Sequence, residues 1–193
     1  MIDGTLSSLL QAARFTVQDP RAGARALMAM GVPMQARWLA MVFAVVGSTL
    51  LTVLAVRLSS IASDPQVAEM LSRPIPLAIM QGVVLIITIN LIHWVGRMAG
   101  GQGRFGDALL LMAWLQVILM ILQVIQIVLE LVFPPAAQAL GLVGLALFLW
   151  LLTNFVAELH GFRSLGLVFG GIIGTVLAVS FGLAVLLVSM GGI

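Results

Sequence analysis

The 193-residue chain contains no cysteine, lysine or tyrosine, and it is poor in charge. Without cysteine it forms no disulfide, thiolate nucleophile or cysteine-ligated metal centre. Charged residues make up 8% of the chain, against about 25% in an ordinary soluble domain. The net charge is only +2, so the basic isoelectric point reflects the missing lysine and tyrosine. We therefore expect no nucleic-acid partner.

Long apolar stretches replace the missing charge, because 62% of the residues are hydrophobic. As a helix with about 1.5 Å rise per residue, a 19-residue stretch reaches about 28 Å, close to the thickness of bilayer hydrocarbon. Continuously apolar segments predict helices rather than β-barrel strands, since backbone groups cannot face lipid unpaired. The sequence predicts an all-α membrane protein: one five-helix domain over 38–193, with spans at about 38–56, 77–95, 108–129, 137–157 and 165–188.

Residues 1–37 form a more polar lead-in, for which we expect short amphipathic helices in the cytoplasm. Asp19 followed by Pro20 predicts the start of a second helix that ends near Met30. Arg21 and Arg25 are one turn apart and are expected to meet anionic lipid headgroups. We favour this membrane-apposed role over a docking site for a partner. Before this second helix, a first apolar face that suits the membrane surface contains Leu6, Leu9, Leu10, Ala13 and Val17.

Arginine is distributed unevenly between the two sides of the predicted bundle. Seven of the nine arginines fall on the side of the N-terminal segment and two on the opposite side. The positive-inside rule then predicts a cytoplasmic N-terminus and an external C-terminus. The exclusive use of arginine with abundant alanine, glycine and leucine indicates a GC-rich bacterial genome, and hence an inner-membrane location. The first group is Arg14, Arg21, Arg25, Arg37, Arg97, Arg104 and Arg163; the second is Arg57 and Arg73.

Polar residues inside a span are costly, and the third span carries several on one face. Their helical positions fall within about 80° of one another and form a polar stripe. One interpretation is hydrogen bonding between helices by the amides. The other is a polar path for a solute or ion. We favour the first. The stripe consists of Gln116, Gln123, Gln126 and Glu130.

A second polar group lies at the cytoplasmic ends of the second and fourth spans. A metal site made by His93, Glu158 and His160 is conceivable. The histidines lie on separate helices without a HExxH pair, however, so we favour a structural ion-pair network and expect no metal, cofactor or catalytic residues. This cytoplasmic-end cluster comprises Asn90, His93, Arg97, Asn154, Glu158 and His160.

The fifth span repeats a small residue every four positions. This small-residue face allows another helix to approach closely. We consider a helix of the same chain a better partner for it than a second protomer. The face consists of Gly166, Gly170, Gly174, Ala178 and Gly182.

The loop from Gly101 to Gly106 matches the GxGxxG pattern, yet it follows a membrane span rather than a strand. A dinucleotide site needs a βαβ unit, so we interpret these glycines as a flexible turn.

The segment 98–105, with Leu109, Leu110 and Trp114 after it, resembles the YIP-domain (Ypt-interacting protein) family, as does the later segment 158–163 before a glycine-rich fifth span. The family-like loop residues are Gly100, Gly101, Gly103 and Phe105. The resemblance implies five spans and association with other membrane proteins. Eukaryotic members bind Rab-type GTPases and carry an acidic, tyrosine-containing cytoplasmic segment. This chain lacks that segment, so Rab binding is not expected.

We therefore expect a non-enzymatic membrane protein that acts through helix packing and through association with lipids and other membrane proteins. A homo-oligomer is compatible with this interpretation. The alternative is a small-solute or ion transporter that uses the polar stripe, although no inverted repeat is evident. A membrane enzyme using His93, Glu158 and His160 ranks third.

Overall fold

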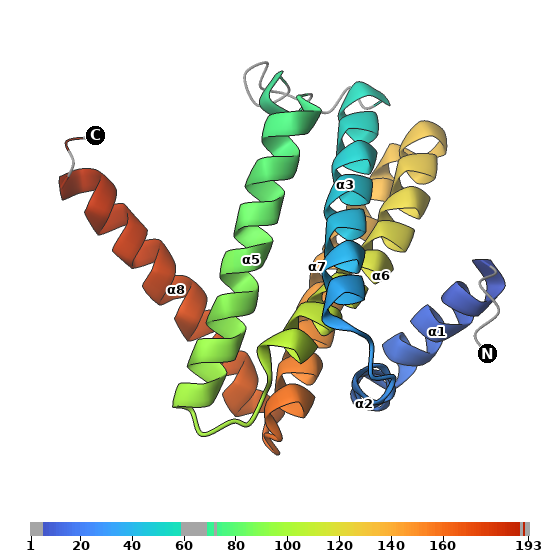
Figure 1. Ribbon diagram of the computed structural model, residues 1–193. Coiled ribbons are helices and arrows are strands. Elements are labelled where there is room, and N and C mark those ends of the chain that lie inside the picture. The colour runs from blue at the N-terminus through green and yellow to red at the C-terminus, as the bar shows by residue number, and fades with distance from the viewer. Residues whose placement is uncertain (1–5, 59–68, 72, 190, 192–193) are drawn as a thin grey trace.

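The computed structural model describes residues 6–58, 69–71, 73–189 and 191 (Figure 1). These residues are helical almost throughout, and none of them lies in a strand. Two short helices precede five that are long and apolar enough to cross a membrane, which confirms the predicted all-α five-span bundle. The short helices are α1 (Leu6–Gln18) and α2 (Pro20–Ala29). The long ones are α3 (Met34–Leu58), α5 (Pro74–Met98), α6 (Phe105–Val132), α7 (Pro134–His160) and α8 (Leu165–Ser189).

The helices extend past the charge-free stretches at most of their ends. Both α5 and α7 start at a proline, Pro74 and Pro134, which fits the first helical turn because its missing N–H has no partner there anyway. Arg57 and Arg97 lie in the last turns of α3 and α5. Long arginine side chains reach the membrane interface from such positions, so a charge does not end a span.

Helix α6 forms the centre of the bundle and packs mainly against α3 and α7. Its first half is buried on several sides, from Ala108 to Leu115 with the exception of the half-buried Trp114. The facing part of α7, from Leu151 to Ala157, is buried as well. The most completely buried large side chains are Ile89, Leu109, Leu111, Leu115, Leu151 and Phe155.

Helices α1 and α2 form where the sequence predicted short helices. Asp19 caps α2, because its Oδ1 accepts a hydrogen bond from the backbone N–H of Ala22 at 2.9 Å, and Pro20 occupies the first turn. Helix α2 packs against the end of α7 and is seen nearly end-on in Figure 1, whereas α3 and α5 run vertically. We call this end of the molecule the α2 end.

Helix α8 departs from the rest of the bundle. It starts beside the end of α7 and then leans away from α5, so that its last turn lies far from the other spans (Figure 1). Only 6% of its most apolar stretch is buried, against 44% for α6. Apart from its first turns, α8 is therefore exposed to whatever surrounds the protein.

Candidate functional site

The end of α7 is a tight turn that directs His160 into the bundle. Gly161 has a φ of +73°, and the N–H of Phe162 donates to the carbonyl oxygen of Ala157 at 2.8 Å. This is a Schellman cap, which needs a left-handed residue and therefore favours glycine. His160 is only 4% exposed, and its Nδ1 lies 3.1 Å from the carbonyl oxygen of Val156, which orients the ring.

Three glycines enclose the imidazole of His160. A Cβ atom added at Gly96, Gly101 or Gly103 would lie less than 3.0 Å from the His160 ring, a separation that real Cβ atoms do not show. Gly96 belongs to α5, and the other two belong to the α5–α6 loop. We call this arrangement the His160 cradle. It joins α5, the loop and α7 by close packing, so these loop glycines serve close approach rather than flexibility.

Gly100 is a glycine for a different reason. Its φ is +86°, and nothing lies within 4 Å of the position of an added Cβ. The N–H of Gly101 donates to the carbonyl oxygen of Gly96 at 2.9 Å, so α5 also ends in a glycine-capped turn. The loop thus follows a helix, which excludes the dinucleotide interpretation.

Aromatic rings extend the packing around the cradle. Phe162 stacks on His160 with ring centroids 5.5 Å apart and planes inclined by 12°. Phe105 meets His93 edge-on at 6.1 Å and contacts Trp38 at 6.3 Å. Four helices and both glycine-containing turns therefore meet at the α2 end.

Glu158 lies on the other side of α7 from His160. Its Oε1 pairs with Nη1 of Arg25 from α2 at 3.0 Å. Arg21, one turn earlier in α2, donates from Nη2 to the carbonyl oxygen of Phe162 at 3.1 Å. The sequence predicted lipid headgroups as partners of these two arginines. In the structure both arginines bond to the end of α7 or the turn after it, and their contact with headgroups stays a prediction.

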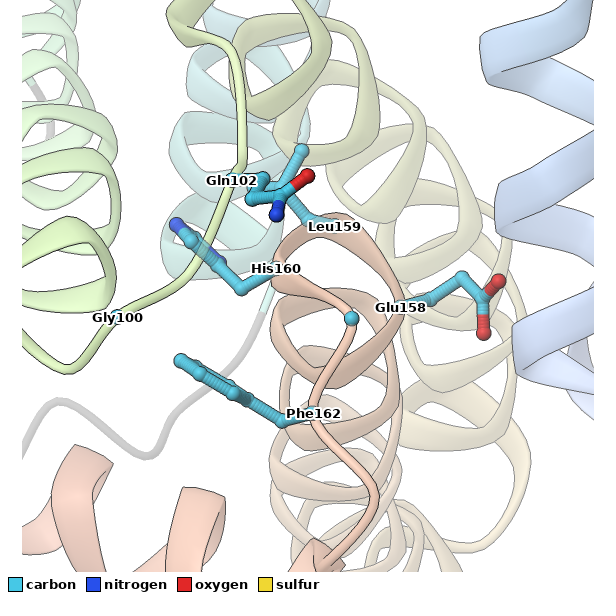
Figure 2. A pocket seen from close by; sticks show the side chains of 7 residues that line it. Gly100, Gln102, Glu158, Leu159, His160 and Phe162 are labelled. Atoms are coloured by element: carbon cyan, nitrogen blue, oxygen red, sulfur yellow. The ribbon is translucent and has the colours of Figure 1, made fainter.

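A hollow of about 450 Å³ opens beside the cradle, and Figure 2 shows the side chains around it. In that view Glu158 points away from His160 and Phe162. The lining residues are Gly100, Gln102, Glu158, Leu159, His160, Gly161 and Phe162. Because Glu158 faces α2, the three residues considered for a metal do not converge, and within residues 6–58, 69–71, 73–189 and 191 no group of three His, Cys, Asp or Glu side chains can hold an ion.

Of the other members of the cytoplasmic-end cluster, the two asparagines bond within their own helices, Arg97 faces outward, and His93 packs edge-on against Phe105. The Nδ2 groups of Asn90 and Asn154 donate to the carbonyl oxygens of Ile86 and Trp150, both at 2.8 Å. Arg97 is exposed. Glu158 therefore has its ionic partner in Arg25 of α2, and the described members of the cluster do not form an ion-pair network among themselves.

A second ion pair joins the starts of two spans. Nη1 of Arg37 in α3 lies 2.7 Å from Oδ1 of Asp107 in α6, and Nε of the same arginine donates to the carbonyl oxygen of Val32 at 2.8 Å. Gly106 leaves room for this guanidinium, because a Cβ there would lie 2.9 Å from Nη1. The sequence interpretation did not pair these residues. The sequence signal for this pair is that Arg37 and Asp107 each lie close to the beginning of a predicted span, on the same side of the membrane.

The polar stripe of α6 contacts its neighbours. Gln123 donates from Nε2 to Thr52 Oγ1 of α3 at 3.1 Å. Gln126 packs on α7, since a Cβ at Gly141 would lie 3.2 Å from its Nε2. Gln116 and Glu130 are half-buried. At its two central positions, the stripe thus lies against other helices.

Gln81 in α5 makes a further polar contact between spans that the sequence interpretation passed over. Its Oε1 accepts from the hydroxyls of Ser48 and Thr49 of α3, at 3.1 and 2.9 Å. The sequence signal for this contact is that Ser48 and Thr49 in the first span and Gln81 in the second lie at similar depths in the membrane.

The small-residue face of α8 has no neighbour in the described residues. Nothing lies within 4 Å of a Cβ built at any of its four glycines, and Ala178 is exposed. The expectation of a partner helix from the same chain is wrong for this part of the structure, because α8 leans away after its contact with α7 (Figure 1). The glycines concerned are Gly166, Gly170, Gly174 and Gly182.

Comparison with protein-family models gives one match: the Yip1 domain, over residues 15–186. This range runs from the last turn of α1 to the end of α8 and includes the His160 cradle. Neither the curated proteins nor the solved structures gave a match.

Proposed function

The chain belongs to the Yip1 domain family, and we propose that it is a non-enzymatic integral protein of a bacterial inner membrane that works by associating with other membrane proteins and with lipids. Its spans, in this proposal, are the working part of the molecule. The cradle and the two ion pairs hold five elements together at the α2 end, and α8 offers the surface for association.

The observation that carries this proposal is the open small-residue face of α8. Between apolar helices in a membrane, association depends on close packing and Cα–H···O contacts, since lipid tails are as apolar as the side chains. Side chains do not keep a neighbour away from Gly170 or Gly174. A span of another membrane protein, or α8 of a second copy, can therefore approach the backbone there.

The test is co-purification from membranes in mild detergent with two matched variants. The Gly174→Leu variant blocks the small-residue face. It creates no clash with the described part of the same chain at its Cβ, because no atom lies within 4 Å of a Cβ built at this position. In Val176→Leu a leucine is placed on the opposite side of α8, at another exposed position. We expect the first variant to lose its co-purifying membrane protein and the second to keep it. Identical sets of bound proteins and lipids in both variants and the parent chain would refute the association through α8.

The proposed orientation is an N-terminus in the cytoplasm and a C-terminus in the periplasm. The support is the arginine distribution, with seven of nine on the N-terminal side. Alkaline phosphatase is active only after export, so it should be active when fused after α8 and inactive when fused before α1. The reverse pattern would overturn the orientation.

Transport along α6 has less support than association. Gln123 and Gln126 are the residues that a solute would meet, and both contact neighbouring helices. The Gln123→Leu variant, reconstituted in vesicles, separates the two functions. Loss of a solute or ion flux present in the parent protein would favour transport, and unchanged behaviour would exclude a path that depends on this amide.

A further inference from the structure

Helix α1 is fixed to the side of α6 at a defined depth. Nε1 of Trp114 donates to Oγ1 of Thr16 at 3.1 Å. Trp114 is the tenth residue of α6, so its backbone lies about 14 Å along the helix from Phe105. Counted from Ala108, where the charge-free stretch begins, Trp114 lies about 9 Å along the helix, which is within the hydrocarbon of one leaflet, about 15 Å thick. The hydrogen bond therefore ties α1 to α6 at a point deeper in the membrane than the first residues of the span.

The elbow between α1 and α2 is closely packed, which restricts how α1 can move. Thr16 is 3% exposed, and Gly23 of α2 approaches it so closely that an added Cβ would lie 2.8 Å from Thr16 Oγ1. Ala13 and Ala24 belong to the same hydrophobic core as α6 and α7. Figure 1 shows α1 rising obliquely from α2 beside the lower part of α6, with its N-terminal end the higher one. Helix α1 thus rises from the α2 end toward the middle level of the spans, while its N-terminal end leans outward from the bundle (Figure 1).

The rest of α1 presents apolar side chains that no part of the described chain covers. Leu6 is 74% and Leu10 44% exposed, and Val17 is exposed as well. These three positions lie within about 40° of one another on the helix, at 100° per residue. Gln11 and Arg14 are exposed on the neighbouring side, which also carries the exposed ring of Phe15. An amphipathic helix of this kind buries its apolar side among acyl chains and leaves its polar side in the headgroup region.

Depth decides between lipid and a soluble partner. On the apolar side of α1, the level reached by Trp114 is hydrocarbon wherever α2 and α6 leave it open, while a long polar side chain such as Arg14 reaches back to the headgroup region from the other side. A soluble protein does not reach that level, whereas acyl chains fill it. We infer that α1 is an obliquely inserted, lipid-contacting helix of one membrane leaflet, on the side where α6 begins, and that the Thr16–Trp114 hydrogen bond sets its depth. This differs from the flat surface helix that the sequence predicted, and it does not depend on α8.

The absence of cysteine makes a direct test possible, because every introduced cysteine is the sole labelling site. Single variants Leu10→Cys, Val17→Cys and Gln11→Cys carry a bimane fluorophore and are reconstituted in vesicles of phosphatidylethanolamine and phosphatidylglycerol. Lipids brominated near the headgroup or deep in the acyl chain quench the fluorophore according to its depth. We expect deep quenching at Leu10, shallower quenching at Val17 and the least at Gln11.

Two results would overturn the inference. Equal depth at Leu10 and Val17 would mean a helix that lies flat on the membrane, and no quenching at either position would mean that α1 does not contact lipid. A further variant, Thr16→Val in the Leu10→Cys background, removes the hydroxyl that Trp114 binds while keeping the volume. We expect its label to move to a shallower depth with unchanged particle size on gel filtration. An unmoved label would show that another contact sets the depth.

Discussion

Gly96 of α5 lies directly against the imidazole of His160 at the end of α7, so closely that a methyl group on the glycine would come within 3.0 Å of the ring. These two residues are 64 positions apart in the sequence. Their contact sets how near the two spans come at the α2 end. It also explains why the glycine-containing loop and the segment 158–163 occur in the same chain: each completes the packing of the other.

We predict that Gly96→Ala lowers stability by about 1–3 kcal/mol, the usual range for overpacking a tight contact. Gly82→Ala is a matched control in the same helix, because its Cβ would lie 3.9 Å from Val45 Cγ1, an ordinary contact. Alanine favours helix over glycine, so the control should be neutral or more stable. Thermal unfolding in detergent, followed by far-UV circular dichroism, measures both. A Gly96→Ala protein as stable as the control would contradict the cradle.

The cradle also predicts that Gly96 and His160 are energetically coupled. His160→Ala removes the ring that the methyl group of Gly96→Ala would strike. The double variant should therefore lose less stability than the sum of the two single variants, with a coupling of about 0.5–3 kcal/mol. Strict additivity in this cycle would mean that the two residues do not constrain each other.

The two ion pairs should differ in strength. The side chains of Arg37 and Asp107 are 13% and 19% exposed, whereas that of Arg25 is 59% exposed. Arg37→Ala leaves Asp107 without its cationic partner in a half-buried setting, which costs about 1–3 kcal/mol. Arg25→Ala should cost about 0–1 kcal/mol, because water and salt screen an exposed pair. Unfolding midpoints at low and high salt separate the two: the effect of Arg25→Ala should shrink with salt, and that of Arg37→Ala should persist. The opposite order would refute this assignment.

The membrane spans are predictable from sequence because hydropathy is a local property. A continuous apolar stretch such as 165–188 crosses a membrane whatever its neighbours do, and α8 forms there. The cap of α2 by Asp19 is local too. Helix ends were less predictable, since first-turn prolines and interfacial arginines extend a helix beyond the charge-free residues.

The partners of individual side chains depended on long-range packing, which composition and spacing do not encode. The sequence marks both His160 and Gly101 as candidate site residues, yet nothing in it shows that they lie against each other. Likewise, Glu158 has acceptable cationic partners on several helices, and only the placement of α2 selects Arg25. The small-residue face of α8 was evident, whereas its lack of a partner within the chain follows from the direction in which α8 leaves the bundle (Figure 1).

Photo-crosslinking in intact membranes tests the central claim, association through α8, most directly. A photoreactive residue replaces Ala178 on the small-residue face, and in a matched protein it replaces Val176 on the opposite side of the helix; both positions are exposed. We predict that light joins the Ala178 protein to a specific membrane protein or to a second copy of the chain, while the Val176 protein mainly labels lipid. Equal labelling of lipid at both positions, with no protein adduct at Ala178, would contradict the account.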